Sequence, residues 1–263
     1  MGRRDGGGGE KRSKRREKRV EKRGEGRQDG DMNGMGHDLK VMPSILSARM
    51  GWLAEDCRRA MDAGSDGLHV DIMDGHFVRN LTMGPDVAAA VREACPEAFL
   101  HVHLMVSRPD IYAPEFIRAG ADMVLVHAES DGDVTGTIRA IKAAGKRAGV
   151  VICPETPVEA VREDIEEGGA DEVLVMTVHP GFGGQAFLEG GLDKMREIRR
   201  RWPGVDISVD GGVNGETGAR CAAAGANVLL AGSHLFKAPD MAAAIREMRA
   251  LAEAARSGVR SEE

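Results

Sequence analysis

The sequence predicts an α/β protein, a single (β/α)8 TIM barrel that follows a disordered basic N-terminal extension. From Val41 onward, short β-rich apolar runs alternate with stretches of helical periodicity, eight of each in about 220 residues. Alternating units of this kind require a parallel sheet, and eight of them can close into a barrel. Runs such as VLVH at 124–127 and VVIC at 150–153 are apolar throughout, as expected of strands covered on both faces. The competing fold is an open doubly wound sheet, which the lack of a G-x-G-x-x-G motif after the first strand disfavours.

The predicted elements follow one another in strict βα order. Strands are expected at 41–46, 67–72, 99–105, 123–128, 148–153, 172–178, 205–210 and 227–233. Helices are expected at 52–63, 85–94, 110–119, 134–144, 158–167, 188–201, 215–224 and 239–255. Glycine follows five of these helices, where a left-handed residue commonly ends a helix. The five are Gly64, Gly120, Gly145, Gly168 and Gly225.

Charge divides the chain into an extension at 1–38, a barrel domain at 39–257 and a disordered tail at 258–263. Residues 1–40 contain 13 Lys and Arg against 8 Asp and Glu, whereas the remainder contains 23 against 34. The extension is rich in Gly, Arg, Lys and Glu, so it buries too little apolar surface to offset its chain entropy. A solvated extension is favoured over a basic arm for RNA, and the acidic barrel domain argues against nucleic acid as a partner.

The chain is expected to work in the cytoplasm, with no membrane as partner. Its four cysteines are scattered, and no C-x-x-C spacing occurs, which fits a reducing compartment. They are Cys57, Cys95, Cys153 and Cys221. No apolar run approaches the ~20 residues that a membrane span needs. The N-terminal residues contain no apolar segment typical of a secretory signal.

Polar side chains lie towards the ends of the predicted strands, where barrels place their chemistry. His69 and Asp71 are two positions apart in a strand and therefore project from the same face. His103 and Asp210 belong to two other strands, and the four residues together suit a divalent metal. The alternative, in which Asp210 caps a turn and Asp71 pairs with a cation of the barrel, is disfavoured.

The two carboxylates indicate a reaction. Asp71 and Asp210 come from predicted strands two and seven, so they can face each other across the barrel mouth. One can remove a proton from a substrate carbon while the other, protonated, delivers a proton to the opposite face. A divalent ion would stabilise the ene-diolate formed in between. The pattern therefore indicates an epimerase.

Glycine-rich segments follow the last three predicted strands, a frequent phosphate-binding position in barrels. Contacts with substrate and phosphate are expected from Gly181, Phe182, Gly183, Gly184, Gly211, Gly212, Gly232 and Ser233. Three methionines near the strand ends either fill the core or form a dry layer that shields the site. They are Met73, Met105 and Met176. His127, two residues before Glu129, is either a further site residue or a structural histidine.

Six segments resemble the ribulose-phosphate 3-epimerase family, in order and over nearly all of 41–255. They are PSILSA, HVDIMDGHFVRNLTMG, HLMV, TVHPGFGGQAF, VDGGV and AGANVLLAGSHLF. The resemblance implies a (β/α)8 barrel that interconverts D-ribulose 5-phosphate and D-xylulose 5-phosphate in the pentose phosphate pathway. It also implies a homo-oligomer and one divalent ion, zinc first, with iron, manganese or cobalt accepted.

The resemblance also implies roles, residue by residue. His69, Asp71, His103 and Asp210 would bind the metal. Asp71 would accept the proton and Asp210 donate it in one direction, and the two would exchange roles in the other. Ser44, His69, His103 and Asp210 would contact the phosphosugar substrate, together with the glycine-rich segments, and the three methionines would shield it.

Five positions depart from the family pattern, and they are Arg79, His101, Cys153, Glu155 and His179. None of them removes an implied ligand. His101 and Cys153 are expected to change hydrogen bonds around the metal ligands, and hence metal preference or rate.

Two other functions stay open on the sequence. A 3-epimerase of a hexulose phosphate such as allulose 6-phosphate would share the same motifs and mechanism. A non-catalytic phosphosugar-binding protein would not need both histidines and both carboxylates, and their retention argues against it.

Overall fold

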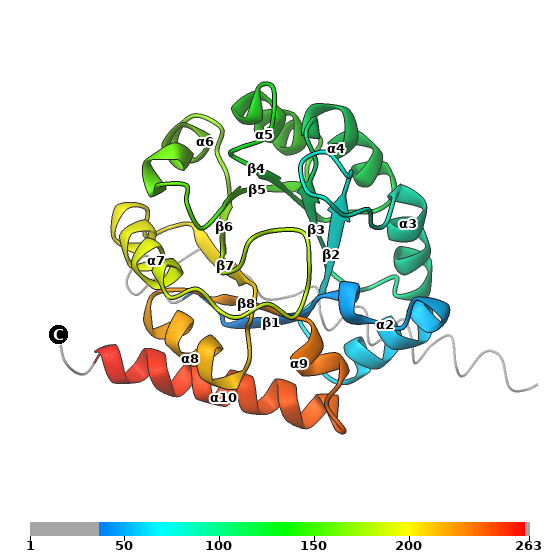
Figure 1. The fold of residues 1–263 in the computed structure, drawn as a ribbon, viewed down its shortest axis with the longest axis vertical. Helices are drawn as coiled ribbons and strands as arrows, with labels where there is room; N and C mark the ends of the chain where they lie inside the picture. The colour runs from blue at the N-terminus through cyan, green and yellow to red at the C-terminus, as the bar shows by residue number, and fades with distance from the viewer. Residues whose placement is uncertain (1–36, 261–263) are drawn as a thin grey trace, which may run out of the picture. The chain divides into compact units, whose positions relative to one another are not determined.

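Eight parallel strands form a ring in the part of the chain that the structure describes (Figure 1). This computed structural model describes residues 37–260; the predicted extension up to residue 36 and the tail at 261–263 lie outside the described residues. The strands are β1 (Lys40–Pro43), β2 (Leu68–Met73), β3 (Leu100–Met105), β4 (Met123–His127), β5 (Arg147–Ile152), β6 (Glu172–Met176), β7 (Asp206–Asp210) and β8 (Val228–Ala231). They pair in the order β1-β8-β7-β6-β5-β4-β3-β2.

The two ends of this order meet beside the predicted site. Ser44, directly after β1, forms an isolated parallel bridge to His69 of β2. This bridge brings the first and last strands of the sheet together, so the (β/α)8 barrel predicted from the sequence is confirmed.

Helices lie outside the ring between successive strands (Figure 1). The principal ones are α2 (Leu53–Asp62), α3 (Pro85–Ala94), α4 (Pro109–Arg118), α5 (Val134–Ala143), α6 (Arg162–Glu166), α7 (Gly190–Arg201), α8 (Gly215–Ala223) and α10 (Met241–Arg260). Three short 3-10 turns are η1 (Ile45–Ser47), η2 (Met50–Trp52) and η3 (Val158–Val161). No helix within 37–260 is both long and apolar enough to cross a membrane.

The structure differs from the predicted elements at several places. The first strand ends at Pro43, and Ile45 and Leu46 enter η1, where the Ser47 amide donates to the Ser44 carbonyl. A short helix that the sequence does not predict, α9 (Ser233–Phe236), follows β8 directly. After α6, the left-handed residue is Gly169 with φ 73°, one position beyond the predicted Gly168.

The other four predicted helix ends are confirmed. Gly64, Gly120, Gly145 and Gly225 all have positive φ values. At these positions a residue with a Cβ would be strained, so glycine sets where each helix stops.

The described domain is slightly longer than the predicted 39–257. His37 belongs to the lower end of the barrel, where the strands begin. Its Nδ1 lies 2.9 Å from Asp206 Oδ1, and its Nε2 lies 2.8 Å from the Pro203 carbonyl oxygen. At the other end, α10 continues to Arg260. The sequence-based boundary excluded His37 because the residues before it are basic and of low complexity, like the rest of the predicted extension.

Strand alternation sorts the apolar side chains into two layers. In β4, Val124 and Val126 belong to the large cluster that includes the helices, whereas Met123 and Leu125 belong to a separate, smaller cluster. Successive residues of a strand point to opposite faces, so the smaller cluster fills the barrel interior.

The interior is polar where β2 meets β3. His69 pairs in register with His101, and Asp71 pairs with His103, on the same alternating face. All four side chains are buried. Buried polar groups need partners, so this part of the barrel must be held together by hydrogen bonds or by a cation.

Candidate active site

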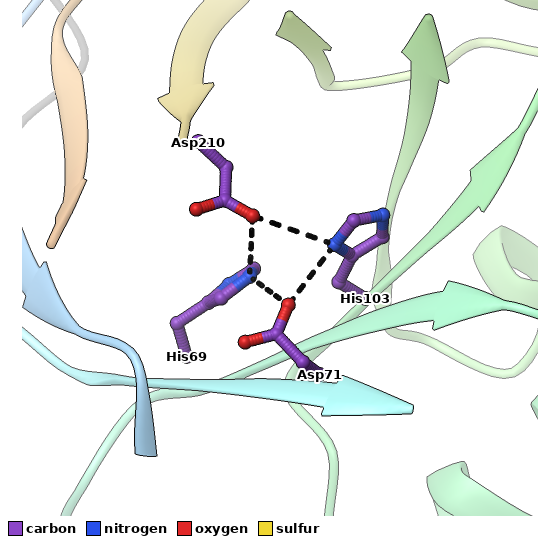
Figure 2. Close-up of side chains that lie close together, drawn as sticks. All are labelled: His69, Asp71, His103 and Asp210. Carbon is purple, nitrogen blue, oxygen red and sulfur yellow. Dashed lines mark hydrogen bonds and ion pairs between the residues drawn. The ribbon is translucent and has the colours of Figure 1, made fainter. Parts of the chain in front are cut away.

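Four side chains from β2, β3 and β7 converge inside the barrel (Figure 2). The Nε2 atom of His69 lies 3.1 Å from Asp71 Oδ1 and 3.9 Å from Asp210 Oδ2. The Nδ1 atom of His103 lies 3.3 Å and 3.9 Å from the same two oxygens. The two carboxylates therefore bracket the two imidazole nitrogens, as Figure 2 shows.

This donor set fits a divalent cation. The four ligand atoms all lie within 4.8 Å of one another. Around a tetrahedral ion with metal–ligand distances of about 2.0–2.2 Å, neighbouring ligand atoms are roughly 3.3–3.6 Å apart, close to the separations observed here. Two imidazoles and two carboxylates suit zinc, iron or manganese better than calcium or magnesium, which prefer oxygen ligands.

The two carboxylates have opposite electrostatic environments. Burial alone would raise the pKa of Asp71, but His69 and His103 hold it well below its usual range. Burial, together with the charge of nearby Asp71, raises the pKa of Asp210 to about 7. At neutral pH, Asp71 is therefore ionised, whereas Asp210 holds a proton far more readily than an ordinary aspartate does.

Hydroxyl groups bind the carboxylate of Asp71 and the main chain of both aspartates. The Ser44 hydroxyl donates to Asp71 Oδ2 over 2.6 Å, and the Thr82 hydroxyl donates to the main-chain carbonyl of Asp71 over 2.7 Å. On the other side, the Thr177 hydroxyl donates to the carbonyls of Asp210 and Gly211. Ser44 was expected to contact the sugar, and here it contacts Asp71.

A cavity of about 550 Å³ opens above these carboxylates. Ten of the twelve predicted substrate-contact residues line it. They are Ser44, Gly181, Phe182, Gly183, Gly184, Asp210, Gly211, Gly212, Gly232 and Ser233. The two exceptions are His69 and His103, which are fully buried and do not line it. In this structure the two histidines therefore contact the carboxylates and do not line the cavity.

Glycine is required in the loop after β7. Gly211 and Gly212 have φ values of 114° and 65°, which other residues rarely adopt. A Cβ on Gly212 would also lie 2.9 Å from the Phe187 nitrogen. The loops after β6 and β7 therefore pack main chain against main chain at the cavity wall.

The three methionines border the cavity. Met73 and Met105 pair in register at the ends of β2 and β3, and Met176 pairs with Asp210 across β6 and β7. All three are buried and line the cavity. They present apolar surface beside the two carboxylates.

Several departures from the family pattern lie around the site. His101 Nδ1 is 2.7 Å from His69 Nδ1, and Cys153 Sγ is 3.6 Å from His127 Nδ1. His179 pairs with Glu155 over 3.4 Å, with both side chains exposed, and Arg79 is exposed. Of these departures, His101 contacts the clustered His69 directly, and Cys153 contacts His127, which in turn contacts His103.

One buried residue was missed by the sequence-based prediction. Glu172 begins β6, is almost fully buried, and lies 2.7 Å from His101 Nε2 through its Oε1. The sequence does carry a signal for this residue. A glutamate that begins the apolar strand EVLVM is expected to have a partner, because an unpaired charge is rarely buried in a strand.

Known proteins are similar to this chain over most of its length. The profile of the "Ribulose-phosphate 3 epimerase family" matches residues 40–236. A ribulose-phosphate 3-epimerase of Bacillus subtilis (strain 168) is 44% identical over 80% of this chain and 98% of its own length. The Escherichia coli (strain K12) enzyme of the same name is 44% identical over 80% and 94%, and a chloroplastic ribulose-5-phosphate-3-epimerase of Arabidopsis thaliana is 43% identical over 81% and 77%.

Solved structures agree on the fold. The 3-hexulose-6-phosphate synthase of Salmonella typhimurium superposes with a TM-score of 0.62 at 22% identity, covering 82% of this chain and all of its own. The 3-keto-L-gulonate-6-phosphate decarboxylase of Vibrio cholerae gives a TM-score of 0.60 at 16% identity, over 82% and 98%. These likenesses support the barrel alone. The profile match and the 44% identical relatives, by contrast, extend through all four clustered residues, and the chain belongs to the ribulose-phosphate 3-epimerase family.

Proposed function

We propose that this protein is a metal-dependent epimerase that interconverts D-ribulose 5-phosphate and D-xylulose 5-phosphate. The observation that carries this proposal is the pair Asp71 and Asp210, which approach the same two imidazole nitrogens from two sides with opposite pKa shifts. The relatives at 44% identity bear the name of this activity.

The two carboxylates supply the proton transfers. In one direction, ionised Asp71 removes the C3 proton from one face of the substrate, and protonated Asp210 delivers a proton to the other face. In the reverse direction the two exchange roles. A pair of acids whose environments separate their pKa values supplies both a base and an acid at neutral pH.

His69, Asp71, His103 and Asp210 would hold one divalent ion, with zinc first and iron, manganese or cobalt as alternatives. When bound, this ion supplies positive charge that stabilises the oxyanion developing on the substrate. Ser44 orients Asp71 by its 2.6 Å hydrogen bond. Met73, Met105 and Met176 exclude water from the reacting carbon.

The remaining lining residues would bind the substrate. The loops at 181–184, 211–212 and 232–233 all border the cavity, and their main-chain amides suit a phosphate group. We further propose a homo-oligomer in the cytoplasm, a compartment that fits the four free thiols of the chain.

A coupled assay on D-ribulose 5-phosphate tests this function. Wild type is stripped by chelation and reloaded with zinc, iron or manganese, and allulose 6-phosphate is assayed in parallel. Metal-restored turnover of the pentulose phosphate, lost in Asp71→Asn and Asp210→Asn, is the expected result. Asp193→Asn, at an exposed carboxylate of α7, serves as the matched control. Wild type without turnover in any metal form contradicts the assignment.

A further inference from the structure

The two clustered histidines face the carboxylates with different ring nitrogens. His69 uses Nε2, whereas His103 uses Nδ1. The remaining nitrogen of each ring therefore points away from the cluster, and both rings are fully buried. A buried ring nitrogen needs a hydrogen-bond partner, so the second nitrogens lead to further groups.

The second nitrogen of His69 leads to a carboxylate through another histidine. His69 Nδ1 lies 2.7 Å from His101 Nδ1, and His101 Nε2 lies 2.7 Å from Glu172 Oε1. His101 is fully buried and Glu172 nearly so. The chain Glu172–His101–His69 thus crosses the barrel interior from β6 through β3 to β2.

The second nitrogen of His103 leads to another carboxylate in the same way. His103 Nε2 lies 2.9 Å from His127 Nε2, and His127 Nδ1 lies 3.0 Å from Glu129 Oε2. The other oxygen of Glu129 accepts from the Cys153 amide over 2.8 Å and from the Thr156 hydroxyl. Glu129 is therefore itself fixed, and the chain Glu129–His127–His103 is the counterpart of the first.

Hydrogen-bond chemistry sets the direction of both chains. An ionised carboxylate only accepts, so the nitrogen beside it must carry the hydrogen. In a neutral imidazole the other nitrogen is then an acceptor. For the first chain, His101 carries its hydrogen on Nε2 and accepts from His69 Nδ1–H, so Nε2 is the nitrogen of His69 whose lone pair can bind a cation held by Asp71 and Asp210.

The second chain reaches the same result with the opposite nitrogens. Glu129 holds the hydrogen of His127 on Nδ1, so His127 Nε2 accepts from His103 Nε2–H. The nitrogen of His103 whose lone pair can bind a cation is then Nδ1, which faces the two carboxylates.

The carboxyl groups at the outer ends of both chains are held in their ionised form. Burial alone would raise the pKa of Glu129, but His127 and Thr156 hold it at about 2. Burial likewise opposes ionisation of Glu172, and His101 keeps the pKa of this carboxyl below its usual value.

We propose that His101 with Glu172, and His127 with Glu129, are positioning residues that fix the tautomers of His69 and His103 for binding a divalent cation. The inference rests on the metal site of the proposed function. Both chains act on the tautomer and orientation of the two ligand rings, and neither contacts the substrate cavity. Outer partners of this kind typically change metal affinity by about 10–100-fold.

Zinc affinity of the full-length protein, measured by competition with a chromophoric chelator, is the first test. Glu172→Gln and Glu129→Gln keep the shape of each side chain and remove its charge. Each is expected to weaken zinc binding by roughly 10-fold or more, and the double variant by the product of the two factors, because the chains support different ligands. Glu253→Gln, at an exposed glutamate of α10, is the matched control and is expected to bind as wild type does.

A variant within one chain separates positioning from general loss of packing. His101→Gln combined with Glu172→Gln is expected to bind zinc no more weakly than His101→Gln alone, since Glu172 acts only through His101. Unchanged zinc affinity in both Glu172→Gln and Glu129→Gln, or a further loss in the combined variant, overturns the proposal.

Ring nitrogen NMR on histidine-labelled wild type tests the tautomers without any substitution. In the metal-free protein, the hydrogen is expected on Nε2 of His101 and on Nδ1 of His127. With zinc, it is expected on Nδ1 of His69 and Nε2 of His103. The reverse pattern at either outer histidine overturns the proposal. This test uses wild type only, so it stands even if a variant fails to fold. Wild type that binds no zinc contradicts the proposed metal site, while the metal-free spectrum still decides the tautomers.

Discussion

The two aspartates of β7 show how the two ends of one strand differ. Asp206, at the start, lies 2.7 Å from Arg147 Nη2, 2.8 Å from Asn227 Nδ2 and 2.9 Å from His37 Nδ1. Burial opposes ionisation there, but these donors lower the pKa of Asp206 to about 2. Asp210, four positions later, has a pKa raised to about 7 by burial and by Asp71.

The difference lies in the partners and not in the residue type. At the lower end, a carboxylate is surrounded by donors and a cation, so its ionised form stabilises the fold. At the upper end, two carboxylates share one small volume, which is unfavourable until a cation or a proton enters. The lower end therefore stabilises the barrel, whereas the upper end is poised for chemistry, as in other (β/α)8 barrels.

Substitution of Asp210 is expected to give the largest effect. Asp210→Asn should lower turnover of D-ribulose 5-phosphate by roughly 10³-fold, because one proton-transfer group is removed. Its unfolding temperature should stay equal to that of wild type or rise, since the substitution removes repulsion with Asp71. The coupled assay and thermal unfolding of the metal-free protein measure the two effects. Less than a 10-fold loss of turnover would contradict a role for Asp210 in proton transfer.

Removal of the metal is expected to distinguish the two ends of β7. Zinc at about 100 times its dissociation constant should stabilise the folded wild type by about 2.7 kcal/mol. Asp206→Asn should gain the same stabilisation, whereas Asp210→Asn should gain much less. Thermal unfolding with and without chelator checks this, and an equal response of the two variants would argue against Asp210 as a ligand.

The acid stability of the barrel should depend on Asp206. Because its folded pKa is depressed, Asp206 stabilises the fold above pH 4, and this contribution is lost as the pH falls towards 2. The contribution is on the order of 2 kcal/mol. Asp206→Asn should therefore unfold more easily at pH 7 and show a flatter stability profile below pH 4, with turnover per folded molecule unchanged. Denaturant unfolding at several pH values provides the measurement.

The smallest expected effect is at the methionine layer. Met176→Leu conserves volume in the buried strand end beside Asp210, so it should cost less than about 1.5 kcal/mol of stability. Met176→Gln should fold but admit water beside the carboxylates and lower turnover more than the leucine variant does. Equal turnover in both variants would show that the layer only fills space.

Local patterns made much of the barrel and its site predictable. The i, i+2 spacing of His69 and Asp71 requires them to share a face in any strand, and the alternation of elements orders the strands around the ring. Asp210 follows from the same reasoning, because it ends the seventh apolar run. The four clustered residues were therefore predictable from spacing and topology.

Contacts across the barrel were not predictable in this way. Glu172 and His101 are 71 positions apart, and their hydrogen bond depends on how β3 and β6 face each other across the closed interior. The direction of each histidine ring also depends on its far partner, which no local pattern encodes. Helix α9 was missed because Gly232 and Ser233 have the composition of a loop.

Hydrogen exchange at C3, followed by NMR in deuterated water with both pentulose phosphates, tests the central claim most directly. With Asp71 and Asp210 acting from opposite faces, each asparagine variant, assayed with zinc well above its weakened affinity, should lose interconversion and keep exchange for one epimer only. Asp71→Asn and Asp210→Asn should retain exchange for opposite epimers. Loss of exchange for both epimers in both variants, or interconversion in either one, would contradict the two-carboxylate mechanism.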